Sequence, residues 1–305
     1  MNAPKESVPI KESVRVLLSG IIDYAGLFPP SQLSMQAAVD NYNSYRNGEH
    51  AWMLGRFILP VSRLDEFLES GGDLIGREGE EPWALSVLAG EDLYDTIKRI
   101  NFFNSQHAPK VVCDVLEVKA NTVSKVENTV KTLPEKLTAY FEISTGDNFA
   151  DLVASLALHS QRAKIRTGGV KREDFPSSQD IIRFVRTCQA ANVPFKATAG
   201  LHHPLRCYRP LTYAADAPQG TMHGFLNMLL MTGFARESFR PPLLEQIMEE
   251  EFDEVFTVRD NGIAWRADHF LTLGHIERLR TNGLNSFGSC SFDEPVADLQ
   301  GLGLL

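Results

Sequence analysis

The chain has 305 residues, of which 43% are hydrophobic and 23% charged, so it is long enough for one large α/β domain or two small ones. Its net charge of −9 argues against partners such as nucleic acid or anionic membranes. No apolar run approaches a membrane span, the segment 1–12 carries no apolar signal core, and the four cysteines follow no disulfide or metal-binding spacing. We therefore expect a cytoplasmic protein that acts on a small molecule.

Short apolar runs alternate with helical patterns along the chain. The expected strands cover residues 19–23, 55–60, 83–88, 110–114, 138–142, 163–166, 193–198 and 285–289. The helical patterns between and after them cover residues 34–45, 63–69, 93–103, 123–133, 152–156, 181–188 and 296–299. Repeated βα units imply parallel strands with crossover helices, and seven units before residue 200 favour a barrel over an open sheet. The sequence therefore predicts the α/β class and a (β/α)₈ TIM barrel.

The stretch 201–284 is too long for an ordinary loop between the seventh and eighth strands. Within it we expect helices at 221–235 and 241–251, and a hairpin at 255–266 with Asn261 and Gly262 in its turn. We interpret the stretch as a helical and hairpin insertion in a single barrel domain spanning 1–305. Since it leaves the carboxyl ends of the strands, it would form a lid or a dimer surface, and we expect a homo-oligomer.

Two lysines, Lys164 and Lys196, stand near the ends of consecutive strands, and each is followed by glycine a few residues later. Two buried lysines that share a cavity should depress each other's pKa, which keeps an amine neutral enough to attack a carbonyl. Side-chain alternation puts Asp114, Glu142 and Arg166 on the same inward face. Active sites of such barrels lie at the carboxyl ends of the strands, where these charges fall. An internal ion-pair network is the structural alternative.

Other polar groups are expected at the same rim. Asp23 ends the first strand, Arg56 shares an inward face on the second, and His202 and His203 follow the seventh. Adjacent histidines on a loop point in different directions, so at most one of them should serve a given site. Gly168 offers a backbone N–H group to an anion. We take these residues as candidates for substrate binding.

Three short patches carry a family resemblance. They are Lys164-Ile-Arg-Thr-Gly168, Lys196-Ala-Thr-Ala-Gly200 and Phe287-Gly-Ser-Cys-Ser291. Together they resemble the motifs of deoxyribose-phosphate aldolases, which are class I aldolases on a (β/α)₈ barrel that use no metal. The resemblance implies Lys164 as the amine that forms the Schiff base, Lys196 as the neighbour that lowers its pKa, and Asp114 as a proton-transfer group. It also implies a phosphate contact near Gly288 and Ser289. Arg166 and the long insertion depart from the family pattern.

Three functional hypotheses follow. The first is a lysine-dependent carbon–carbon lyase that acts on a small anionic carbonyl compound and needs neither metal nor cofactor. The second is a metal-assisted lyase, isomerase or hydrolase in which Asp23, Asp114, Glu142 and one histidine hold a divalent ion. The third is a barrel that binds an anionic metabolite without turnover. We favour the first because of the inward lysine pair.

Overall fold

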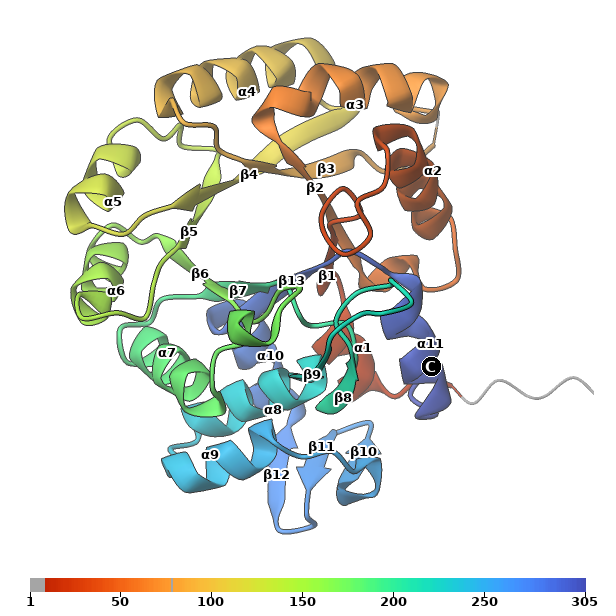
Figure 1. Cartoon of the computed structure of the whole chain (residues 1–305), viewed down its shortest axis with the longest axis vertical. Coiled ribbons are helices and arrows are strands. Elements are labelled where there is room, and N and C mark those ends of the chain that lie inside the picture. Colours follow the sequence, from red (N-terminus) through yellow and green to blue (C-terminus); the bar gives the residue numbers. More distant parts are fainter. Residues whose placement is uncertain (1–8, 78) are drawn as a thin grey trace, which may run out of the picture.

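A computed structural model describes residues 9–77 and 79–305 and shows a closed barrel of eight parallel strands inside a ring of helices (Figure 1). The barrel strands are β1 (Ile22–Tyr24), β2 (Leu54–Pro60), β3 (Trp83–Leu88), β4 (Val111–Lys119), β5 (Thr138–Glu142), β6 (Arg162–Arg166), β7 (Phe195–Thr198) and β13 (Leu284–Ser289). The order around the barrel is β1-β13-β7-β6-β5-β4-β3-β2. The predicted (β/α)₈ TIM barrel is confirmed.

Eleven α-helices accompany the strands in the described part of the chain. They are α1 (Glu12–Leu18), α2 (Met35–Arg46), α3 (Leu64–Gly71), α4 (Leu93–His107), α5 (Val123–Val130), α6 (Phe149–Leu158), α7 (Ser178–Ala190), α8 (Phe225–Arg236), α9 (Pro241–Met248), α10 (Leu273–Asn282) and α11 (Asp293–Gly301). In α7 the side chain of Ser177 accepts a hydrogen bond from the backbone N–H of Asp180, which satisfies one of the free donors of the first turn. In the described part of the chain, no helix is long and apolar enough to cross a membrane, and most of segment 1–12 lies outside that part.

Strand β4 runs five residues further than its sequence pattern predicts, from Val111 to Lys119. Its register against β3 shifts between Cys113 and Val115, so that Asp114 is an unpaired extra residue in the ladder. Strict alternation from Asp114 would turn Glu117 toward the helices. Because of the bulge, Glu117 points into the barrel instead, where its carboxylate contacts both Lys164 and Lys196.

The segment 201–284 contains both barrel helices and additions. Hairpin β8 (Cys207–Pro210) and β9 (Gln219–Met222) precedes α8, and the sheet β10 (Phe256–Arg259), β11 (Gly262–Trp265) and β12 (His269–Thr272) follows α9. Helix α8 packs against α7, and α10 packs against α1, so both lie in the outer helical layer. The predicted 221–235 helix was wrong at its start, since β9 occupies 219–222. The predicted hairpin exists, but its turn residues are Asp260 and Asn261 and a third strand follows it.

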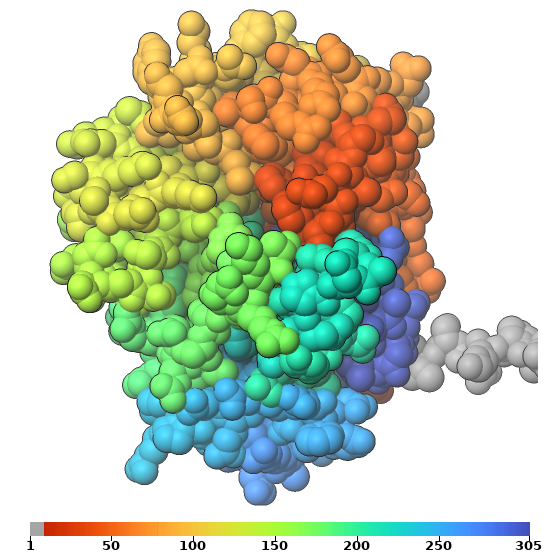
Figure 2. Space-filling model, in the orientation of Figure 1, coloured from red at the N-terminus to blue at the C-terminus, as the bar shows by residue number. Residues whose placement is uncertain are grey.

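Two segments cover the carboxyl ends of the barrel strands. Figure 2 shows the green stretch around Arg172–Asp174 and the teal β8–β9 hairpin side by side at the front of the molecule. They contact each other, and the guanidinium of Arg172 donates a hydrogen bond to the hydroxyl of Tyr208. The mouth of the barrel is therefore roofed on this side, while the part over β3, β4 and β5 stays open.

Candidate active site

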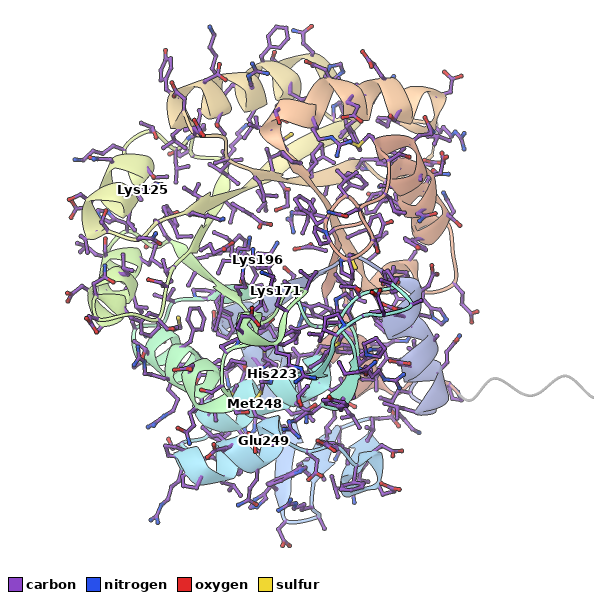
Figure 3. All side chains as sticks on the ribbon, in the orientation of Figure 1. Lys125, Lys171, Lys196, His223, Met248 and Glu249 are labelled. Carbon is purple, nitrogen blue, oxygen red and sulfur yellow. The ribbon has the colours of Figure 1, made fainter. Side chains whose placement is uncertain are left out.

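A charged network occupies the centre of the barrel where apolar packing would be usual. Glu117 bridges the two lysines: its Oε2 lies 2.7 Å from Lys164 Nζ, and its Oε1 lies 2.7 Å from Lys196 Nζ. Ser86 donates a hydrogen bond to the same Oε1. Lys164 and Lys196 are direct register partners on β6 and β7, so the fold itself brings them together. Figure 3 shows Lys196 inside the ring of strands.

Each ammonium group has a second carboxylate. Asp23 Oδ2 lies 2.6 Å from Lys196 Nζ, and Glu142 Oε2 lies 2.8 Å from Lys164 Nζ. Arg166 is the third cation, with its Nε 3.5 Å from Glu142 Oε1. Three carboxylates thus balance three cations, which is how buried charges avoid the full cost of desolvation.

The pairing decides the protonation of the inner lysine. Burial lowers the pKa of Lys196, but Asp23 and Glu117 outweigh it and hold that pKa above its ordinary value. Burial likewise raises the pKa of Glu117, and the ammonium groups of Lys164 and Lys196 outweigh it and hold that pKa well below its usual range. The expectation that the two lysines depress each other's pKa is therefore wrong for Lys196, because the carboxylates lie between the amines.

Lys164 is the lysine that faces open space. It lines a cavity of about 250 Å³ beneath the roof and also a wider groove of about 1310 Å³ over β3, β4 and α5. Glu117 and Leu88 line both spaces as well, so the two meet at the network. The side chains of Lys164 and Lys196 are 4% and 1% exposed, and Lys196 lines neither space. A ligand entering from the mouth meets Lys164.

Several predicted binding residues surround the cavity. Arg166 and Gly288 line it, and the side chain of Arg166 is 50% exposed. A Cβ on Gly288 would lie 3.2 Å from Ile58 Cδ1, so glycine keeps the cavity floor open. Gly168 packs its Cα directly on Gly200, which explains both glycines by close approach of two chains. Ser289 is buried at the end of β13.

Asp114 and Arg56 do not join the lysines. Arg56 Nε and Nη2 donate to Asp114 Oδ1 and Oδ2 at 2.8 and 2.7 Å. Ile58, two residues further along β2, shares their inward direction and lines the cavity, so the pair lies nearer the amino ends of the strands. The placement of Asp114 beside the lysines is corrected, because the bulge gives that role to Glu117. Asp23 is instead part of the network, and its Oδ1 accepts the backbone N–H of Arg56.

The two histidines diverge. His202 lines the 250 Å³ cavity, whereas His203 Nδ1 lies 2.6 Å from Asp298 Oδ2 on α11. The four ligands of the metal-assisted hypothesis are consequently spread over separate ion pairs. Within residues 9–77 and 79–305, no group of three or more His, Cys, Asp and Glu side chains is arranged to hold a metal ion.

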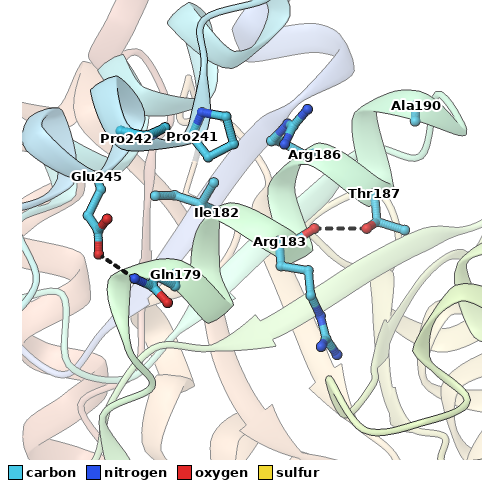
Figure 4. A pocket seen from close by; sticks show the side chains of 9 residues that line it. All are labelled: Gln179, Ile182, Arg183, Arg186, Thr187, Ala190, Pro241, Pro242 and Glu245. Carbon is cyan, nitrogen blue, oxygen red and sulfur yellow. Dashed lines mark hydrogen bonds between the residues drawn. The ribbon is translucent and has the colours of Figure 1, made fainter.

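A further groove of about 640 Å³ lies on the outer surface between α7 and α9 (Figure 4). It is lined by side chains such as Arg183, Arg186 and Glu245, and Gln179 donates a hydrogen bond to Glu245 across it. This groove is separated from the barrel interior by the helical layer. The charged mouth of the barrel is therefore the candidate active site.

The scan against protein-family models finds no match to this chain, and the search of curated proteins finds no significant similarity. A TIM barrel is a frequent scaffold for enzymes but does not specify a reaction. The geometry of the network and the cavity is therefore the basis on which a function can be proposed.

Proposed function

We propose that the protein is a carbon–carbon lyase in which Lys164 forms a Schiff base with a small anionic carbonyl compound. The observation that carries this proposal is an amine that lines the cavity and contacts two carboxylates of different exposure. The side chain of Glu117 is 2% exposed and that of Glu142 is 15% exposed, and both line the groove. Such an arrangement can both remove a proton from the amine and stabilise the cation that replaces it.

Glu142 is the group positioned to take the proton. Its Oε2 lies 2.8 Å from Lys164 Nζ, within the range of direct proton transfer. The neutral Nζ then attacks the carbonyl carbon, one of its two remaining protons passes to the carbonyl oxygen to give a hydroxyl, and Glu142 returns its proton when that hydroxyl leaves as water. The resulting iminium carries the same positive charge as the ammonium it replaces. Glu117, 2.7 Å away, therefore stabilises the covalent intermediate without rearranging.

The iminium supplies the electron sink for bond cleavage. A proton leaves the substrate hydroxyl next to the breaking carbon–carbon bond, the carbon that bears this oxygen departs as a carbonyl compound, and the bonding electrons move into the iminium to give an enamine. Protonation of the enamine and hydrolysis by water then release the second product and free Lys164. Glu142 is the carboxylate we assign to these proton transfers, since it is the more exposed of the two carboxylates that contact Lys164.

Lys196 has an electrostatic role in this proposal. Its pKa is held above the ordinary value by Asp23 and Glu117 after burial is counted against it, so it stays charged and makes a poor nucleophile. Its charge keeps Glu117 ionised beneath the reacting amine. Arg166, half exposed at the rim, offers its remaining N–H groups to an anionic group of the substrate.

The direct test is reductive trapping. The protein is incubated with small aldehydes and ketones, with and without phosphate groups, reduced with borohydride and analysed by intact mass and peptide mapping. We expect an adduct on Lys164 that disappears in Lys164→Arg and persists in Lys125→Arg, a matched control since Lys125 lines the outer part of the groove. A compound that is turned over without any adduct on Lys164 would refute the proposal.

One observation favours a second candidate, a barrel that only binds its ligand. Each ammonium group already has two carboxylates, as in a purely structural network. This candidate predicts that anionic carbonyl compounds raise the melting temperature while none of them is converted. Product analysis of the same incubations separates the two functions.

A further inference from the structure

A thiol faces a histidine at the edge of the same cavity. Cys290 Sγ lies 3.9 Å from His202 Nδ1, and both residues line the 250 Å³ space. Cys290 directly follows β13 and His202 closely follows β7, and these strands are neighbours in the barrel. The fold thus brings together two residues that are 88 positions apart in the chain.

Three further groups hold this pair in place. Glu294 Oε2 lies 3.3 Å from His202 Nδ1, and the hydroxyl of Tyr213 donates to Glu294 and lies 3.9 Å from Cys290 Sγ. Ser31 donates to the backbone carbonyl of Cys290. The Glu294 carboxylate and the Cys290 sulfur thus lie on the same imidazole nitrogen, Nδ1, and the carboxylate favours the charged form of the ring.

The titratable groups around the pair come from four elements. Glu294 belongs to α11, Tyr213 to the β8–β9 hairpin, Tyr24 to β1, and His203 follows His202 in the chain. Burial raises the pKa of the Cys290 thiol, but the hydrogen bond and charge of His202 outweigh it and hold that pKa below its ordinary value. Burial lowers the pKa of His202, and Cys290 and Glu294 outweigh it and raise that pKa to about 9.

The other cysteines provide an internal contrast. Cys113 and Cys188 are buried, and burial raises the pKa of both thiols. Cys207 is partly exposed, and burial again is the main cause that raises its pKa. Among the four, Cys290 alone lines this cavity and contacts a histidine that is itself paired with a carboxylate.

We propose that Cys290, His202 and Glu294 form a nucleophilic thiol site that reacts with small hydroperoxides entering the barrel mouth. Sγ attacks one peroxide oxygen, the S–O bond forms and the O–O bond breaks. The leaving hydroxide or alkoxide takes a proton from the His202 imidazolium and departs as water or an alcohol. Sulfur is oxidised to sulfenic acid and the peroxide is reduced. This chemistry is independent of the proposed lyase activity.

Alkylation with iodoacetamide measures the reactivity of each thiol in the intact chain. At about pH 6.5 we expect Cys290 to react about tenfold faster than Cys207, because an ordinary thiol is only about 1% thiolate there. His202→Gln should slow Cys290 about tenfold and move its pH profile upward, whereas His203→Gln, which alters the neighbouring ring, should leave it within about twofold. Equal rates for Cys290 and Cys207, or a pH profile unchanged by His202→Gln, would overturn the proposal.

Hydrogen peroxide followed by dimedone tests the oxidation itself. Peptide mapping should place the sulfenic acid adduct on Cys290 at peroxide concentrations that leave Cys207 unmodified. Cys290→Ser, checked for its fold by circular dichroism, should lose that adduct. Modification of Cys207 before Cys290, or of neither, contradicts the assignment. Borohydride trapping on Lys164 is scored separately, so failure of one proposal does not hide failure of the other.

Discussion

Lys164 and Lys196 are the same residue type, stand opposite each other on adjacent strands and share the carboxylate of Glu117. Their second partners differ. Asp23, beside Lys196, is sealed with a side chain 2% exposed, whereas Glu142, beside Lys164, lines the open groove. The two lysines therefore differ in access, because Lys164 borders the cavity and the groove and Lys196 lines neither. In the proposed reaction, this difference makes Lys164 the amine that exchanges a proton.

The largest effect is expected from removing the inner cation. Lys196→Met leaves Asp23 buried without an ammonium partner and Glu117 with Lys164 alone, and it should lower the free energy of unfolding by about 3–5 kcal/mol. Lys164→Met should cost less, since water can reach Glu142 from the groove. Urea denaturation of both variants tests this order. Equal losses would mean that the two sites do not differ in solvation.

The charge on Glu117 can be tested by pH. Its folded pKa is lowered and its unfolded value is about 4.3, so the unfolded state binds more protons below that pH. The stabilisation by this carboxylate is complete above about pH 5 and declines as the pH falls. The stability difference between wild type and Glu117→Gln, measured by urea denaturation at several pH values, should therefore shrink below about pH 4. A difference that does not change with pH would show that Glu117 stabilises the fold by hydrogen bonding and not by its charge.

An intermediate effect is expected at Gly55. A Cβ there would collide with Asp23 Oδ1 and approach the carbonyl oxygen of Ile22 to 3.1 Å, which displaces Asp23 from Lys196. Gly55→Ala should cost about 1–3 kcal/mol, as overpacking of a filled interior does. Gly301→Ala in α11, where a Cβ would meet nothing within 4 Å, is the matched control and should be neutral or slightly stabilising. Thermal unfolding of the two variants gives the comparison.

The smallest effect is expected at the ion pair of Arg56 and Asp114, near the amino ends of the strands. Arg56 and Asp114 are each about one-third exposed, so Asp114→Asn should cost about 1 kcal/mol or less. It should also leave borohydride trapping on Lys164 intact, whereas the aldolase resemblance implies that Asp114 moves protons in the reaction. Peptide mapping of the trapped variant decides between these outcomes. Loss of the adduct in a folded Asp114→Asn variant would show that Asp114 takes part in the reaction at Lys164.

Periodicity was sufficient to predict the barrel. Runs such as 83–88 and 138–142 coincide with β3 and β5, because regular βα units leave a clear alternation of patterns. The meeting of Lys164 with Lys196 also followed from strand position. The identity of the bridging acid did not, because a bulge shifts the parity of β4 and no local pattern marks it.

Contacts between residues far apart in the chain were the second feature that the sequence could not predict. The contact of His202 with Cys290 depends on two loops that leave neighbouring strands, and the sequence gives no spacing that marks it. The signal that was present and unused is Glu117 itself, an acid between Leu116 and Val118 in an otherwise apolar stretch. An isolated carboxylate within a buried strand requires a cation nearby.

Because Asp114 is an extra residue in β4, the Arg56–Asp114 ion pair can be lost in a related chain without a change in the lysine network. Asp114 has no partner in the ladder, so a relative lacking that one position would regain a regular strand in which Glu117 still faces the lysines. Such a chain would lose the carboxylate that holds Arg56 and keep the upper charges unchanged. Length variation at this point of homologous chains should therefore change the side chains near the amino ends of the strands and leave those at the carboxyl ends unchanged.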